Sequence, residues 1–225
     1  MNPIPENVRC FLVDIDGTLT KYRENALTPE KLLHSNFLFP IIRDMMTERG
    51  WKKEEAEQAI RKLAEEVIFW DYSDFIAEFG LDAKEAFRRF RQWHAENLLP
   101  CEDGVSLVKR LHADGAKLFI MSNNPYLGCL FKLQAAGLAD DDFSSPYFAR
   151  IFGTNILRGC KCDPNVWKRA FAQIPADISE IGTVGDNPKE DRDIPASLGV
   201  RHSVILSREV ILHGVETYQT ENSPS

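Results

Sequence analysis

Two aspartates separated by one residue follow an apolar run near the start of the chain. The run Cys10–Val13 leads into Asp14, Ile15, Asp16 and Gly17. Charged side chains at the end of a buried strand are typical of a site, because open parallel sheets bind ligands beyond the carboxyl ends of their strands. Two neighbouring carboxylates cannot both stay ionised and unpaired at low cost, so the pair indicates either a divalent cation or a division into nucleophile and acid. A helix cap or an aspartate-stabilised turn is the alternative without chemistry.

Candidate anion ligands occur at two later positions. Ser122 and Asn123 follow the apolar run Ala116–Met121, and a hydroxyl with backbone N–H groups before a helix can bind an anion. Lys161 precedes another predicted helix, where its ammonium could neutralise a phosphate or the charge between carboxylates. A plain helix cap and a solvated surface lysine are the respective alternatives.

An acidic loop completes the set. The apolar run Ile178–Val184 leads into Gly185 and Asp186, with Asp191 and Asp193 behind them. Mg²⁺ takes one or two carboxylates together with waters and substrate oxygens, so an oxygen-rich loop of this kind suits it. A solvated acidic turn is the alternative. All four clusters stand at strand ends, and a parallel sheet would bring them to one edge.

The elements that must position these clusters are short apolar runs alternating with helix-like segments. This alternation is typical of a parallel sheet covered by helices on both faces, and we predict a Rossmann-like α/β fold. The predicted strands are Val8–Val13, Ala116–Met121, Ile178–Val184 and Val200–Leu206, with Phe148–Phe152 as a candidate fifth. The predicted helices are Val105–Ala113, Pro125–Ala136, Pro164–Gln173 and Ile194–Leu198.

The stretch from Leu19 to Pro100 breaks this alternation, since it has almost no strand-like run. Its helix-like segments are Pro29–Arg49, Lys53–Trp70 and Ala83–Leu98. We predict that residues 1–18 and 101–225 form an α/β core domain and that residues 19–100 form an all-helical domain inserted into it.

Composition limits the partners of the protein. The chain has 225 residues and a net charge of −7, which disfavours nucleic acid or an anionic membrane as the main partner. No apolar run approaches the ~20 residues that a membrane span needs. The five cysteines are irregularly spaced, and Cys160 and Cys162 lack the second pair expected of a zinc site. We therefore expect a cytoplasmic protein with reduced thiols.

In the order of its motifs the chain resembles the haloacid dehalogenase (HAD) superfamily, in its phosphatase branch. The four family motifs are matched by Asp14-Ile15-Asp16-Gly17-Thr18, Ser122-Asn123, Lys161 with Asp163-Pro164, and Gly185-Asp186 with Asp191. Two departures occur: Cys162 stands where a proline is common, and Glu190 stands before Asp191 where relatives often have asparagine. The helical insertion falls where one class of the family carries a cap domain.

The resemblance implies a role for each polar residue. Asp14 would be the nucleophile that forms an aspartyl-phosphate, and Asp16 would protonate the leaving oxygen and then activate water. Lys161 and Ser122 would hold the phosphoryl oxygens and offset their charge, together with Asn123. Thr18 would orient the turn beside the phosphate.

The resemblance also implies a Mg²⁺ site. Its ligands would be Asp14, the backbone carbonyl of Asp16, and Asp186, with Asp191 as a ligand or support. Asp193 is the alternative to Asp191. We favour Asp191, because the spacing between Asp191 and Gly199 fits the family better.

The function that follows is a Mg²⁺-dependent phosphatase acting on a small soluble phosphomonoester. Asp16 favours this chemistry, because halide-displacing and phosphonate-cleaving relatives differ at that position. A sugar-phosphate phosphomutase and a non-catalytic binding protein on the same scaffold are the alternatives. The substrate is left open, with Lys21–Arg23 near the expected hinge and Trp70–Tyr72 in a cap loop as candidate specificity segments. Either a monomer or a homodimer is compatible with the sequence.

Overall fold

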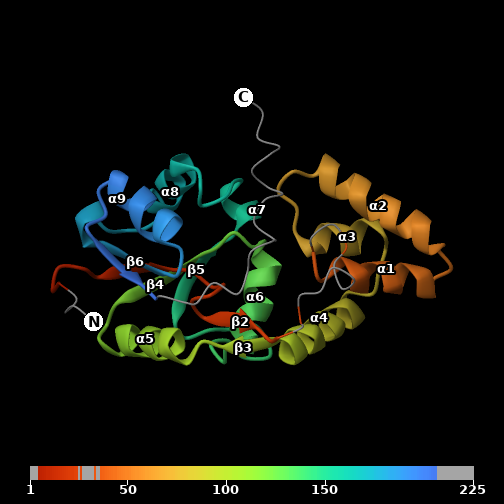
Figure 1. Ribbon diagram of the computed structural model, residues 1–225, viewed down its shortest axis with the longest axis horizontal. Helices are drawn as coiled ribbons and strands as arrows, with labels where there is room; N and C mark the ends of the chain where they lie inside the picture. The colour runs from red at the N-terminus through yellow and green to blue at the C-terminus, as the bar shows by residue number, and fades with distance from the viewer. Residues whose placement is uncertain (1–4, 25, 27–32, 34–35, 207–225) are drawn as a thin grey trace.

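A five-stranded parallel sheet forms the centre of the computed structural model, which describes residues 5–24, 26, 33 and 36–206 (Figure 1). In spatial order its strands are β5 (Phe148–Phe152), β4 (Lys117–Met121), β1 (Cys10–Val13), β6 (Ile181–Gly185) and β7 (His202–Ile205). All five predicted strands are therefore confirmed. The run predicted from Ile178 becomes a strand only at Ile181, because Ile178–Glu180 forms a 3₁₀ turn. Residues 1–4 and 207–225 of the predicted core domain lie outside the described residues.

The sheet separates two apolar layers, and alternate residues of β1 point into different layers. Phe11 and Val13 pack with α5 (Glu102–Ala113) and α6 (Tyr126–Ala135). Cys10 and Leu12 pack on the opposite face with α8 (Pro164–Phe171). Helices on both faces explain why β1 is apolar at every position, and they confirm the predicted Rossmann-like α/β core. The short helices α7 (Thr154–Leu157) and α9 (Ile194–Ser197) complete the core.

The strand order places β1 at the centre of the sheet. This strand pairs with β4 on one side and with β6 on the other, in parallel register on both sides. The connection after β1 leads to α5 on one face of the sheet and the connection after β6 leads to α9 on the other, and open parallel sheets bind ligands at the carboxyl ends of strands where this occurs. Asp14 is the first residue past the end of β1 and therefore lies at this edge of the sheet.

Helices fill most of the inserted stretch and share their own apolar core. They are α1 (Phe39–Glu48), α2 (Lys53–Glu66), α3 (Tyr72–Glu78) and α4 (Ala83–Asn97). A short antiparallel ladder joins β2 (Thr20–Tyr22) to β3 (Leu98–Pro100), so the two connections between this helical region and the core run side by side. Figure 1 shows the helical region as a separate layer beyond α6.

The prediction of an all-helical insertion differs from the structure in its short strands and in the bounds of its helices. It omitted β2 and β3, because three residues are too few to display a strand periodicity. The helix predicted from Pro29 begins only at Phe39, since Leu33 and Asn36 pair in a bridge and the Asn36 side chain accepts a hydrogen bond from the N–H of Leu38. Residues 29–32, 34 and 35 of that predicted helix lie outside the described residues.

Helix α6 joins the core to the helical region. Its residues Leu127 and Phe131 are buried in the apolar core of the helical region. The buried carboxylate of Asp71, at the start of α3, accepts hydrogen bonds from the backbone N–H of Leu127 at 3.1 Å and from the side chain of Asn155 at 3.0 Å. The junction between the core and the helical region therefore combines the hydrogen bonds of Asp71 with the apolar packing of Leu127 and Phe131.

Candidate active site

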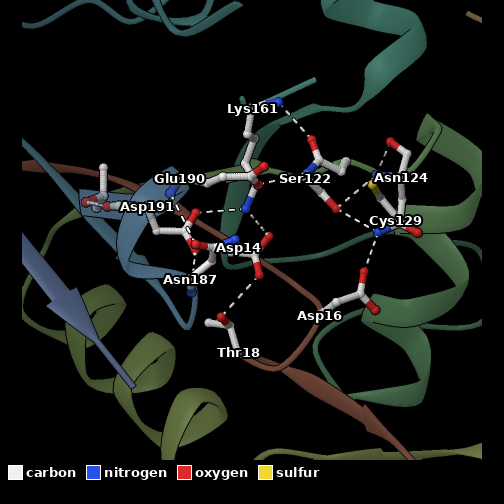
Figure 2. A network of polar contacts seen from close by, with 12 residues as sticks. Asp14, Asp16, Thr18, Ser122, Asn124, Cys129, Lys161, Asn187, Glu190 and Asp191 are labelled. Atoms are coloured by element: carbon white, nitrogen blue, oxygen red, sulfur yellow. Dashed lines mark hydrogen bonds and ion pairs between the residues drawn. The ribbon is translucent and has the colours of Figure 1, made fainter. Parts of the chain in front are cut away.

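The predicted motif residues gather at the carboxyl edge of the sheet (Figure 2). Asp14 follows β1, Ser122 follows β4 and Asp186 follows β6. Lys161, from the turn before α8, and Asp191, from the π-helical turn Lys189–Asp193, reach the same place (Figure 2). Residues separated by more than a hundred positions meet here because parallel strands end at the same edge.

Lys161 lies between two buried carboxylates. Its Nζ is 2.6 Å from Oδ1 of Asp14 and 2.8 Å from Oδ1 of Asp191. Burial opposes the charge on the ammonium, yet the two carboxylates raise the pKa of Lys161 above its ordinary value. Burial and the neighbouring Asp191 raise the pKa of Asp14, and Lys161 opposes this shift. The three groups form one coupled unit in which the lysine remains charged.

A third carboxylate gives the cluster an excess of negative charge. Oxygens of Asp14, Asp186 and Asp191 lie within 4.8 Å of one another. Burial raises the pKa of Asp186 to about 6, and repulsion by Asp191 adds to this effect. Three carboxylates face one ammonium, so a divalent cation would bring the ionised cluster to neutrality. Oxygen ligands at this spacing fit Mg²⁺.

Two glycines make this packing possible. A Cβ on Gly185 would lie 2.1 Å from an oxygen of Asp191, and a Cβ on Gly17 would lie 1.9 Å from an oxygen of Asp186. Gly17 also has a φ of +72°, which side chains rarely adopt. The glycines of the first and fourth motifs therefore provide space for the two acidic side chains.

The fourth loop turns Asp191 inward and Asp193 outward. The π-helical turn Lys189–Asp193 buries Asp191, whose Oδ2 accepts a hydrogen bond from the N–H of Asn187 at 3.1 Å. The hydroxyl of Thr183 donates to the backbone carbonyl of Asp191. Asp193 is exposed and pairs with Arg192 at the surface. The structure brings Asp191, and not Asp193, into contact with Lys161.

Thr18 and the second motif surround Asp14. The Thr18 hydroxyl donates to Oδ2 of Asp14 at 3.2 Å. Ser122 is buried beside the site, with its Oγ accepting from the side chain of Asn124 at 2.8 Å. The side chain of Asn123 accepts from the backbone N–H of Lys161 at 2.8 Å and donates to Glu190 at 2.9 Å. The amide of Asn123 is therefore engaged in joining the third and fourth motif loops.

Asp16 contacts a second buried lysine, Lys132, instead of Lys161. Its Oδ1 is 2.6 Å from Nζ of Lys132, and its Oδ2 accepts a hydrogen bond from the Asn124 side chain. The same Nζ is 2.8 Å from Oδ1 of Asn124 and 3.3 Å from the Tyr22 hydroxyl. Burial opposes ionisation of Asp16, but Lys132 and Asn124 lower its pKa below the ordinary value.

The sequence analysis did not identify Lys132 or Asn124 as site residues. One signal was present, because Lys132 interrupts the otherwise apolar run Leu127–Leu133 within a predicted helix. A lysine on such a face requires a partner when it is buried. The partner is 116 residues away in the chain, so its identity becomes visible only in the fold.

Two other sequence-based expectations concern the chain as a whole. The five cysteines are thiols in the structure, and none of them forms a disulfide. None of the helices among the described residues is long and apolar enough to cross a membrane.

Several solved structures resemble the model at low sequence identity. A HAD phosphatase from Thermococcus onnurineus has a TM-score of 0.53 and 23% identity over 92% of this chain and 89% of its own. The UTR4 protein of Saccharomyces cerevisiae has a TM-score of 0.54 and 16% identity over 89% and 91%. A HAD family enzyme of Bacteroides thetaiotaomicron, in complex with magnesium and inorganic phosphate, has a TM-score of 0.52 and 13% identity over 88% and 93%. These identities support a shared fold.

Family membership comes from a wider sequence comparison. No curated protein matches the chain significantly. The family model for the haloacid dehalogenase-like hydrolases matches residues 8–199, which include all four motifs and the helical insertion. The chain therefore belongs to the haloacid dehalogenase-like hydrolase family and is a hydrolase with that family's α/β core.

Proposed function

We propose that this hydrolase is a Mg²⁺-dependent phosphatase that acts on a small phosphomonoester through an aspartyl-phosphate. The observation that carries the proposal is the position of Asp14. It ends the central strand, a lysine at 2.6 Å orients one of its oxygens, and a threonine donates to the other. Phosphoryl transfer depends mainly on positioning and charge stabilisation, which such a nucleophile with a neighbouring ammonium provides.

In the first step, an oxygen of Asp14 bonds to phosphorus while the bond from phosphorus to the leaving oxygen breaks. Because Lys132 and Asn124 lower the pKa of Asp16, its carboxylate would first take up a proton from solvent and would then give that proton to the leaving oxygen. In the second step, water attacks phosphorus and gives a proton to Asp16, and the bond between phosphorus and Asp14 breaks. Asp16 is suited to this exchange because it is separate from the carboxylates around Lys161.

The remaining residues would hold the phosphoryl group and the metal ion. Lys161 and Ser122 would bind phosphoryl oxygens, with the Asn123 backbone and Thr18 supporting them. Asp14, Asp186 and the carbonyl of Asp16 would hold Mg²⁺, and Asp191 would support it. When bound, the ion would offset the charge of the phosphoryl oxygens. The structurally similar Bacteroides enzyme was solved in complex with magnesium and inorganic phosphate, which supports the proposal that the site binds these two ligands.

The helical region would act as a cap over the leaving group. We place its boundaries at residues 19 and 100, at the β2–β3 ladder that joins it to the core. Tyr22, which ends β2, reaches the network of Asp16 through Lys132. Residues of the hinge therefore lie next to the proposed acid, where a leaving group would be bound and water excluded.

Phosphate release from a panel of phosphomonoesters, with Mg²⁺ and with EDTA, tests the proposal. We expect metal-dependent release from the wild-type protein and a loss of at least about 10³-fold in Asp14→Asn, since nothing replaces the nucleophile. A thermal unfolding midpoint close to that of the wild type would show that the variant is folded. Near wild-type release by Asp14→Asn would contradict the nucleophile assignment. Transfer of phosphate to a second substrate hydroxyl, with slow release to water, would favour a mutase instead.

A further inference from the structure

We propose that Lys132 and Asn124 form a clamp that positions the side chain of Asp16 for proton transfer to the leaving group. The inference rests on the proposed function, because it assigns a task to residues around the proposed acid. Lys132 acts through Asp16 and is a positioning residue, not a catalytic one.

Each oxygen of Asp16 has its own partner in the clamp. Lys132 binds Oδ1 at 2.6 Å, and the Asn124 side chain donates to Oδ2. Lys132 and Asn124 also contact each other, with Nζ 2.8 Å from Oδ1 of Asn124, which closes a ring of three side chains. A carboxylate held at both oxygens cannot rotate without breaking a contact. Each oxygen keeps a further lone pair, so the clamp leaves room for the proton that is transferred.

Lys132 is buried, and this indicates that its ion pair with Asp16 does more than fill space in the core. The residue is 5% exposed and lies on an otherwise apolar segment of α6. Burying an ammonium costs several kcal/mol unless it is paired, and an apolar side chain of similar size usually packs at least as well. The three N–H groups of the Lys132 ammonium are all used, because Nζ donates to Asp16, to Asn124 and to the Tyr22 hydroxyl.

The clamp is tied to its surroundings on two sides. On the side of the phosphate, Asn124 donates to Oγ of Ser122 at 2.8 Å. On the side of the hinge, the Tyr22 ring packs against Phe37, with centroids 5.0 Å apart, and against Trp93. Asp16 is thus oriented relative to both the proposed phosphate site and the helical region.

Two esters with different leaving groups separate this role from a merely structural one. 4-Nitrophenyl phosphate releases a phenolate that needs no proton, whereas 2-glycerol phosphate releases an alcohol that does. We expect Lys132→Met to lower kcat for the glycerol ester at least about tenfold more than for the nitrophenyl ester, because general acids contribute about 10²–10⁴-fold. Equal losses for the two esters, or no loss for either, would overturn the inference.

A second variant and a double mutant guard against a folding defect. Asn124→Ala removes the other half of the clamp without leaving a buried charge, and we expect the same selective loss. In an Asp16→Asn background, Lys132→Met should lower kcat for the two esters equally, because the carboxylate that Lys132 positions is gone. Persistent selectivity in that background would overturn the inference. A crystal structure of Lys132→Met should show Asp16 in a different rotamer, and an unchanged rotamer would also overturn it.

The outcome also distinguishes this inference from the function on which it rests. If the wild-type protein releases no phosphate from either ester with Mg²⁺, the proposed function fails and the clamp fails with it. If the wild type is active and Asp14→Asn is inactive, while the clamp variants lose both esters equally, only the clamp fails.

Discussion

Two buried lysines lie at the same edge of the sheet, and their surroundings differ in charge. Lys161 contacts Asp14 and Asp191, with Asp186 close by, so carboxylates outnumber ammonium groups there. Within the described part of the chain, Lys132 forms an ion pair with Asp16, and its other hydrogen bonds are with the neutral side chains of Asn124 and Tyr22. The first centre has an excess of negative charge, whereas the second is balanced.

The difference indicates two kinds of function. A centre with excess negative charge gains free energy from a cation and from a group that shares its charge, which suits a metal ion and a nucleophile. A balanced centre has no excess charge for a cation to offset, and its hydrogen bonds fix the geometry of the side chains. The same edge of the sheet thus holds two lysine–carboxylate centres. The one with three carboxylates suits ligand binding, and the one with a single carboxylate suits orientation of a side chain. The predictions below test this contrast, beginning with the largest effect.

Replacing Lys161 by methionine should have the largest effect. It removes the only ammonium paired with Asp14 among the described residues and leaves Asp14 and Asp191 without it. We expect turnover of both the nitrophenyl and the glycerol ester to fall at least about 10²–10³-fold, in contrast to the selective loss in Lys132→Met. Without metal, the variant should unfold with a free energy about 3–5 kcal/mol lower.

Thermal unfolding with Mg²⁺ and with EDTA measures the stability part of this prediction. Mg²⁺ should raise the Tm of Lys161→Met more than that of the wild type, because the cation replaces the missing positive charge. An equal rise in both proteins would contradict the charge balance that we assign to this centre.

The second effect is a pH dependence of the metal-free protein. The pKa of Asp186 is about 6 in the folded state and near 3.9 when unfolded. Between these values the folded state binds more protons, so the contribution of Asp186 to stability falls as pH rises from about 4 to 6. Mg²⁺ binding needs the ionised carboxylate, so Mg²⁺ should raise the Tm more at pH 7.5 than at pH 5.

The matched control for this prediction is Asp186→Asn, measured by the same unfolding curves. His94 contributes the opposite slope, since burial lowers its pKa to about 4 and the unfolded state then binds more protons below pH 6.5. Because both proteins contain His94, the difference between their curves isolates Asp186. A difference that does not change with pH would contradict the raised pKa.

The sequence predicted the excess-charge centre better than the balanced one, for a physical reason. The residues around Lys161 follow strand ends, and strands are recognisable from short apolar runs. Their meeting point then follows from the parallel sheet. Lys132 lies in the middle of a helix and has no such marker, apart from its apolar neighbours. Its partners come from three separate elements, so only the packing of α6 against β2 and the first motif brings them together.

The helical region likewise contains parts that the sequence predicted and parts that it did not. Helices α2 and α4 have 14 and 15 residues, long enough to display an apolar periodicity, and they were predicted within a few residues of their ends. Helix α3 has seven residues and was not predicted separately. Its N-terminus is fixed by Asp71, whose role at the junction depends on a contact with Leu127, 56 positions away. Trp70–Tyr72 was a candidate specificity segment of a cap loop, and the described contacts of Asp71 are at the junction with the core.

Asp71 offers a third arrangement, a buried carboxylate held by N–H donors. It accepts from the N–H groups of Tyr72 and Leu127 and from the Asn155 side chain. In Asp71→Asn, one oxygen becomes an NH₂ group that faces donors, so we expect the free energy of unfolding to fall by about 1–3 kcal/mol. Urea unfolding measures this change. Asp82→Asn is the control, because Asp82 caps α4 at an exposed position and asparagine caps equally well.

The smallest effect should come from Asp193→Asn. The side chain is 58% exposed and pairs only with Arg192 among the contacts described for it, and such surface pairs contribute about 0–1 kcal/mol. We expect metal-dependent phosphate release within about twofold of the wild type. Asp191→Asn, two positions away, should reduce release strongly, because it weakens the contact with Lys161 and removes a charge from the acidic cluster. Similar losses in the two variants, measured at several Mg²⁺ concentrations, would show that charge in this loop matters more than contact with Lys161. The contrast between the two lysine centres would then lose its basis in geometry.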